Sequence, residues 1–305
     1  MFRIFSALVC LLTLVTPVAA EYIHPGDVDV KTVRYNPDAR KIFPGTYHYS
    51  VEWEGIPVAK AEVEIKEPLG DSAQELVEVS TNTKTSGLVS AFYRMKHHSE
   101  SVFKKDDYQP VKFTSYQREN SKKKYRNVHF EDDGRVVSER WKKGKEKTKI
   151  QFESDNAVFD PISAAFLARS LDLEEGKEIS FDVYNGKHRF LIGFSVKGKE
   201  RVKVGREWHQ AFKVIPSVTK LTDSEGEQKL RSAALWISAD EEREILKLES
   251  KVWIGSVTAE FEKFESAEPT VAEPAIAEND TESEPGAKPK QTAKASQSIE
   301  LAHKN

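Results

Sequence analysis

Histidine and cysteine are the residue types that most often carry catalysis or bind metals, and their positions in this chain predict neither. The eight histidines are dispersed, and only His97 and His98 are adjacent. Neighbouring residues of a strand point to opposite faces of a sheet, so these two side chains would not share one metal ion. The chain also lacks the HExxH spacing of metalloproteases, a glycine-rich phosphate loop and a nucleophile elbow. We therefore expect no metal site, no cofactor and no catalytic residue.

Carboxylates are abundant, but they gather where turns are predicted. Acidic pairs and triplets stand at 106–107, 131–133, 174–175 and 240–242. General acid–base catalysis needs carboxylates that converge in a cleft, whereas turns simply expose them to water. Asp160 precedes Pro161, the pattern of a helix N-cap followed by the first helical residue. An enzyme is therefore the least favoured of the functions considered below.

The most unusual stretch, residues 118–149, contains twelve Lys or Arg and six Asp or Glu. Its candidates for contact with an anionic surface lie near predicted turns and are Lys122, Lys123, Lys124, Lys142, Lys143 and Lys145. One interpretation is a basic hairpin that docks on anionic lipid head groups or on an acidic partner. The other, which we favour because acidic residues are interspersed, is that lysines protect sheet edges from pairing with other chains.

Large apolar side chains are the second set of candidates, because a curved sheet can enclose an apolar ligand. The residues expected to line such a cavity are Trp53, Leu88, Phe92, Tyr93, Phe113 and Trp236. Small barrels fill their interior with side chains, while larger ones enclose a ligand. Both arrangements are compatible with the sequence, so packing in a solid core is the alternative for each of these residues.

Period-two alternation predicts that the scaffold for these residues is a sheet. Residues 47–53 alternate apolar and polar side chains, and so do residues 61–65 after a turn at Gly55-Ile56-Pro57. Similar runs recur along the chain, separated by turn signals. Short helices are predicted over 86–95 and from Asp160-Pro161 onward. The expected fold class is all-β with minor α: a curved antiparallel sheet, or an open or closed β-barrel, with one or two short helices.

The start of the chain has the layout of a secretory signal. Residues 1–20 combine one basic residue, an apolar run and small residues before a polar segment. The apolar run is about twelve residues, whereas a membrane span needs about twenty. We expect cleavage after Ala20, export to the periplasm and no transmembrane segment in the mature chain. Cleavage removes Cys10, the only cysteine, so no disulfide is expected.

The rest of the chain is expected to form one domain between two irregular segments. Residues 21–44 are predicted to be an extended arm, and residues 45–265 a single β-rich domain. Residues 266–305 contain no aromatic residue and are predicted to be a disordered tail. The net charge of −3 gives no reason to expect a nucleic-acid partner.

Four short motifs follow one another between Gly45 and Phe264. They are Trp53-Glu54-Gly55-Ile56-Pro57-Val58-Ala59, Ser86-Gly87-Leu88 with Phe92-Tyr93-Arg94, Asp160-Pro161-Ile162-Ser163, and Leu235-Trp236-Ile237-Ser238-Ala239-Asp240 with Arg243. In this order they resemble the bacterial domain-of-unknown-function family 3108. The resemblance implies an exported protein without an established activity. It also implies a curved antiparallel sheet similar to the half-barrels of periplasmic lipoprotein carriers, an analogy of fold that does not by itself give a function.

Three functions are compatible with these features. The favoured one is a non-catalytic periplasmic protein that binds an apolar or lipid-like ligand of the cell envelope. The alternative is a cell-envelope interaction module with a filled core, which binds an envelope protein or an anionic membrane surface through its basic hairpin and tail. The third, an enzyme, would need polar residues that converge in a pocket.

Overall fold

The computed structural model describes residues 22–32, 35, 37, 42–66, 75–222, 232–251 and 255–267. The chain divides into two units, Met1–Glu268 and Pro269–Asn305, of which the second lies wholly outside the described residues. The predicted signal peptide over 1–20 and nearly all of the predicted tail over 266–305 also lie outside them.

The first unit consists mainly of strands. In chain order its elements are η1 (Pro25–Asp27), β1 (Gly45–Trp53), β2 (Ile56–Ile65), β3 (Leu76–Thr85), α1 (Val89–Phe92), β4 (Met95–Lys104), β5 (Pro110–Glu119), β6 (Lys122–Phe130), β7 (Arg135–Lys142), β8 (Thr148–Glu153), β9 (Val158–Phe159), α2 (Pro161–Ser170), β10 (Glu178–Tyr184), β11 (Arg189–Val204), β12 (Glu207–Lys220), β13 (Ser232–Ser238), β14 (Ile245–Lys251) and β15 (Ser256–Ser266).

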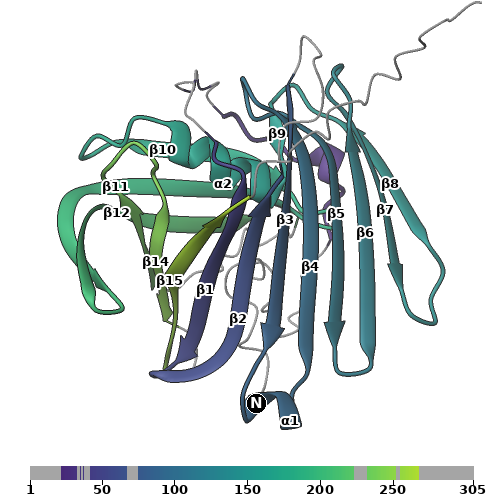
Figure 1. Ribbon diagram of the computed structural model, residues 1–305. Helices are drawn as coiled ribbons and strands as arrows, with labels where there is room; N and C mark the ends of the chain where they lie inside the picture. The colour runs from purple at the N-terminus through teal and green to yellow at the C-terminus, as the bar shows by residue number, and fades with distance from the viewer. Residues whose placement is uncertain are drawn as a thin grey trace, which may run out of the picture. The chain divides into compact units, whose positions relative to one another are not determined.

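All the strands among the described residues belong to one curved sheet (Figure 1). Their order is β8-β7-β6-β5-β4-β3-β2-β1-β15-β14-β13-β12-β11-β10-β9. Neighbouring strands are antiparallel, except for the short parallel pair β9–β10. The predicted fold class, a curved antiparallel sheet with one or two short helices, is confirmed.

The inner face of the sheet is set by alternation along each strand. In β1, Tyr47, Tyr49 and Val51 are buried, while the residues between them are partly exposed. Cross-strand pairing continues this face through β2 to β7, and the registers of β5 with β6 and of β6 with β7 run without a shift. Bulges interrupt the register in β1 and β4, where they add local twist and bend the strands.

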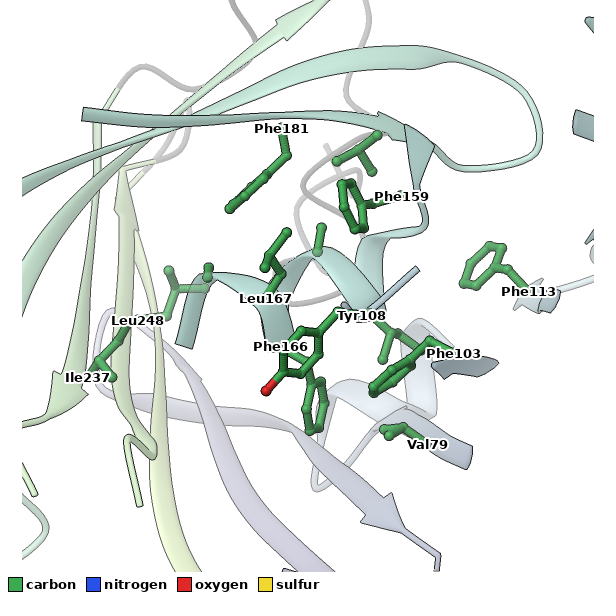
Figure 2. Close-up of a cluster of buried hydrophobic side chains, with 14 of the residues drawn as sticks. Val79, Phe103, Tyr108, Phe113, Phe159, Phe166, Leu167, Phe181, Ile237 and Leu248 are labelled. Atoms are coloured by element: carbon green, nitrogen blue, oxygen red, sulfur yellow. The ribbon is translucent and has the colours of Figure 1, made fainter. Parts of the chain in front are cut away.

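Helix α2 packs on the inner face and forms the main core with it. The Phe166 ring lies 5.3 Å from the ring of Phe103 on β4. Figure 2 shows Phe166 and Leu167 among side chains contributed by both halves of the sheet, including Val79, Phe103, Phe181, Ile237 and Leu248. Helix α2 therefore covers part of the inner face and packs against strands from both halves of the sheet. No helix among the described residues has the length and apolar character needed to cross a membrane.

The predicted helix over 86–95 is a single turn, α1. Its expected last residue, Met95, instead begins β4, because Met95, His97, Ser99, Ser101 and Phe103 alternate as buried positions along that strand. The main-chain N–H of Tyr93 donates to the carbonyl of Val89, and Tyr93 is already extended. Strand periodicity thus extends towards the N-terminus into a segment whose apolar content indicated a helix.

A buried ion pair ties the first described segment to the sheet. Arg189 on β11 is 2 % exposed, and its Nε donates to Asp182 Oδ1 on β10 at 2.9 Å. Its Nη1 donates to the Pro25 carbonyl of η1 at 2.7 Å, and its Nη2 donates to Ser154 Oγ at 2.6 Å. A buried charge is tolerated when it is paired and its remaining donors are satisfied, which these bonds achieve.

Candidate functional site

Two neighbouring strands, β6 and β7, place cations directly opposite one another on the inner face. The register pairs Arg126 with Arg140, and Lys124 with Lys142. All four have the strand parity of the buried residues Val128 and Ser138 and therefore lie on the inner face. We call these four residues the inner cation ladder. Like charges in direct cross-strand pairs are destabilising, so the ladder requires a reason other than the stability of the sheet.

The loop between β10 and β11 brings further cations to the ladder. Arg126 Nη1 donates to the Asn185 carbonyl at 3.3 Å, and Gly186 packs against the Arg126 side chain. Tyr184 joins the two sets of strands, because its hydroxyl bonds to Ser138 Oγ on β7 at 2.7 Å. Lys187 follows in the same loop.

The electrostatics of this region are those of a cationic, partly dehydrated site. Burial lowers the pKa of Lys187 to about 8, and the charged groups that lower it further are Lys220, Arg126, Arg140 and Lys142. Burial has the largest effect on His188 and lowers its pKa to about 2, and the positive charges of Lys187 and Lys220 act in the same direction. His188 is therefore neutral, and its Nδ1 lies 2.9 Å from Thr222 Oγ1.

One carboxylate stands at the end of the ladder nearest α1. Glu119 lies 3.8 Å from Lys124 Nζ and 3.7 Å from His97 Nε2. The interaction with His97 and the charge of Lys124 hold the pKa of Glu119 below its usual value despite its partial burial. Glu119 therefore offsets one of the four charges. Among the described residues, Nη1 of Arg140 is buried without a hydrogen-bond partner.

At the same depth, strands β1 and β2 contribute apolar side chains to the main core. The cross-strand row that contains Lys124 and Lys142 begins with Tyr49 on β1 and Ala61 on β2. The next row towards the α1 end begins with Val51 and Ala59, and all four of these side chains are buried. The inner face is thus apolar on one side and basic on the other, an arrangement that suits an amphipathic molecule.

Asp160 is a buried titratable group on the inner side, and its role is structural. It caps α2, since its Oδ1 accepts from the N–H groups of Ile162 at 2.7 Å and Ser163 at 3.3 Å. Its Oδ2 accepts from Ser101 Oγ at 2.6 Å. Burial raises the pKa of Asp160 to about 6, although these hydrogen bonds act in the opposite direction. The predicted N-cap at Asp160-Pro161 is confirmed.

A small hollow of about 310 Å³, which includes space open to solvent, lies at the C-terminal end of α2. Its walls include Phe166, Arg169 and Tyr47. Arg169 Nε donates to the Arg243 carbonyl at 2.7 Å, and its Nη2 donates to the Glu242 carbonyl at 2.9 Å. The charged wall of this hollow is therefore used to hold the β13–β14 turn against α2.

The structure does not gather the six predicted cavity residues at one place. Phe113 is buried in the main core, and Trp53 and Tyr93 are half-buried against it. Trp236 is buried in a second cluster with Val202, Val204, Ala211 and Leu246, where its Nε1 donates to Glu200. Leu88 and Phe92 are 86 % and 81 % exposed. The expectation that these two line an enclosed cavity does not fit, because α1 is too short to fold its apolar side onto the sheet.

The six predicted surface lysines also divide into groups. Lys124 and Lys142 belong to the inner cation ladder, while Lys143 and Lys145 lie in the β7–β8 turn, and Lys122 and Lys123 begin β6. Aromatic residues interleaved with them stack on the outer face, where the Tyr125 ring lies 4.7 Å from Tyr116 and 4.6 Å from Trp141.

Sequence reasoning missed Arg126, Arg140 and Lys187. The spacing of two residues from Lys124 to Arg126, and from Arg140 to Lys142, was a usable signal once β6 and β7 were taken as strands. Lys187 carried no signal, because a fold-dependent loop brings it to the ladder. Among the described residues, no group of three or more His, Cys, Asp or Glu is placed to hold a metal ion.

Comparison with known proteins gives a family match and distant structural similarities. The family described as protein of unknown function (DUF3108) matches residues 48–262. No curated protein matches the sequence. A beta-barrel-like protein of domain of unknown function DUF1849 from Brucella abortus is similar with 9 % identity and a TM-score of 0.48, over 74 % of this chain and 99 % of that chain. A protein with a YmcC-like fold from Bacteroides fragilis is similar with 7 % identity and a TM-score of 0.34, over 81 % of this chain and 100 % of that chain.

Proposed function

The chain belongs to the DUF3108 family of proteins of unknown function, and we propose that it is a non-catalytic binding protein for an anionic, lipid-like ligand of the cell envelope. In this proposal the signal peptide directs the protein to the periplasm. The anionic group of the ligand binds at the inner cation ladder, and its apolar part lies along the β1–β2 side of the inner face.

The observation that carries the proposal is that the register sets like charges opposite one another in two cross-strand pairs, Arg126–Arg140 and Lys124–Lys142. Each contact opposes folding unless a negative charge lies between the partners. Arg side chains bind phosphate or carboxylate through two parallel hydrogen bonds, and Lys adds a mobile point charge. A phosphate or carboxylate head group would relieve the repulsion and occupy the donor that Arg140 leaves unpaired among the described residues.

The apolar part of the proposal rests on the amphipathic division of the inner face. Ala59 and Ala61 are small, and they stand in the same rows as the bulkier Val51 and Tyr49. Burial of an alkyl chain there would contribute about 0.8 kcal/mol for each methylene group. The polar and apolar sides lie on one continuous sheet, separated by β3, β4 and β5, so a ligand long enough to cross these three strands would contact both.

Native mass spectrometry tests this proposal directly. The mature chain is purified from the periplasm, and its mass is measured intact and after lipid extraction. The test variant is Arg126→Gln/Arg140→Gln. The matched control is Arg135→Gln, which changes a cation on the opposite face of the same strand, 3.8 Å from Asp133.

The proposal predicts a stoichiometric anionic amphiphile on the wild type and on the control variant, and its loss from the double variant. The double variant should remain folded, with an unfolding free energy equal to or about 0.2–1 kcal/mol above that of the wild type, because a repulsive pair has been removed. A clean apo mass for the wild type, with no uptake when envelope lipids are offered, contradicts the proposal and favours the interaction module. A neutral ligand retained equally by all three proteins contradicts the role given to the ladder.

A further inference from the structure

One end of the sheet carries a continuous row of turns. The β1–β2, β3–β4, β5–β6 and β7–β8 connections all lie at this end, because each odd-numbered strand of the series finishes there. Main-chain hydrogen bonds join neighbouring turns: Ser86 N–H donates to Val58, Asn120 N–H to Arg94, and Lys143 N–H to Lys123. We call residues 54–57, 86–94, 119–123 and 142–147 the α1 rim. Figure 1 shows α1 projecting beyond the ends of the strands.

Three large apolar side chains of the α1 rim face solvent. Leu88 is 86 % exposed, Phe92 is 81 % exposed and Ile56 is 55 % exposed. None of the residues of α1 is buried, so this turn contributes little to the core. Exposing apolar side chains to water is unfavourable, and these side chains do not stabilise the fold in return. Such exposed apolar patches commonly mark interaction sites.

The same rim is strongly basic. Lys122, Lys123, Lys143 and Lys145 lie on it, and within the described residues no ion pair engages any of these four. Lys142 beside them has a lowered pKa, caused first by partial burial and then by the charges of Lys124 and Lys145. The rim therefore combines projecting apolar residues with an excess of Lys and Arg over the acidic residues Glu54, Glu119 and Glu146.

We propose that the α1 rim docks on an anionic lipid bilayer. Leu88, Phe92 and Ile56 enter the boundary between head groups and acyl chains, while the lysines of the adjoining turns contact lipid phosphates. A second copy of this chain is a poorer occupant, because a two-fold contact would set the lysines of one rim against those of the other. The outer aromatic stack of Tyr125 and Trp141 stands next to the basic turns, where aromatic rings with a polar edge suit a membrane interface.

Vesicle co-sedimentation measures this interaction. The mature chain is titrated with vesicles of phosphatidylcholine, with and without phosphatidylglycerol. One variant, Leu88→Ser/Phe92→Ser, removes the apolar contacts, and a second, Lys143→Gln/Lys145→Gln, removes charge from one turn without touching the ladder. Trp208→Ser is the control, since Trp208 is 58 % exposed but lies next to the β11–β12 turn, whose Gly205 bonds to Glu260 on β15. Circular dichroism confirms that all variants fold.

The inference predicts binding that needs phosphatidylglycerol and weakens with salt. Partitioning should fall about thirtyfold in the double lysine variant and at least about tenfold in the Leu88/Phe92 variant, with no change for Trp208→Ser. Binding that is independent of phosphatidylglycerol, or unchanged in either double variant, would overturn the inference. So would a self-association, seen by sedimentation velocity and abolished by Leu88→Ser/Phe92→Ser, in a chain that does not bind vesicles.

Discussion

The replacement Asp160→Asn should make the protein more stable at neutral pH. Asp160 is fully buried, and its Oδ1 caps α2 while its Oδ2 accepts from Ser101. Asparagine caps helices about as well as aspartate, so its carbonyl can keep the bonds to Ile162 and Ser163. The amide nitrogen can donate to Ser101 Oγ, because a hydroxyl also accepts. The substitution therefore removes a buried charge and retains the hydrogen bonds.

The magnitude and the sign follow from the pKa of Asp160. Burial raises it from 3.8 to about 6, and a difference of this size corresponds to about 3 kcal/mol. The folded state holds the proton more tightly than the unfolded state, so this group destabilises the fold as the pH rises from about 4 to about 6. Below that window both states are protonated and the penalty is absent; above it the penalty is complete.

Urea unfolding followed by tryptophan fluorescence, repeated across this pH range, measures the effect. The difference in unfolding free energy between Asp160→Asn and the wild type should grow from near zero at about pH 4 to as much as about 3 kcal/mol at about pH 7. Asp160→Ala removes both the charge and the helix cap. Its unfolding free energy should therefore be about 1 kcal/mol or more below that of Asp160→Asn at every pH. A difference between the asparagine variant and the wild type that does not change with pH would refute the reasoning.

Three further perturbations address other parts of the structure. Arg189→Met leaves Asp182 buried and unpaired, and should lower the unfolding free energy by about 3–5 kcal/mol in urea; a loss below about 1 kcal/mol would contradict the burial of this pair. Gly45→Ala places a Cβ 2.4 Å from the Glu265 carbonyl at a φ of +149°, and should cost about 1–3 kcal/mol by thermal unfolding, more than Gly55→Ala, whose Cβ meets nothing within 4 Å. Lys187, whose pKa is lowered to about 8, should be acetylated by limiting acetic anhydride at a pH where ordinary lysines are protonated. A bound anionic amphiphile should stabilise the charged form of Lys187 and shift the pH dependence of its acetylation to higher pH. An unchanged pH dependence would count against the inner site.

The fold was accessible from the sequence where local and tertiary preferences agree. Alternation in β1 and β2 predicted both the strands and the buried face, because side-chain direction in a strand depends only on parity. The start of α2 was equally predictable from the sequence. Asp160 accepts hydrogen bonds from the free N–H groups of the first turn, and Pro161 has the backbone conformation that a first helical residue needs. These features need no knowledge of which strand lies next to which.

The site was less accessible because it depends on register. Lys124 and Lys142 were identified as surface lysines, yet only the pairing of β6 with β7 sets them opposite one another beside Arg126 and Arg140. Leu88 and Phe92 were expected to line a cavity because their spacing indicates a helix with an apolar side. The helix ends after one turn, since the strand pattern of β4 continues back to Met95, and the two side chains are left outside.

The inner cation ladder and the α1 rim lie at the same end of the sheet. From Arg126, the inner-face positions of β6 pass through Lys124 to Lys122 at the rim, and those of β7 pass from Arg140 to Lys142. Basic groups therefore line a path from the interior to the turns that carry Leu88 and Phe92. An anionic head group moving along this path would always lie next to at least one cation. This lowers the electrostatic barrier for a ligand that enters or leaves the inner face. The two proposals are independent in their tests, but the register places the inner cation ladder at the end of the sheet whose turns would meet the bilayer.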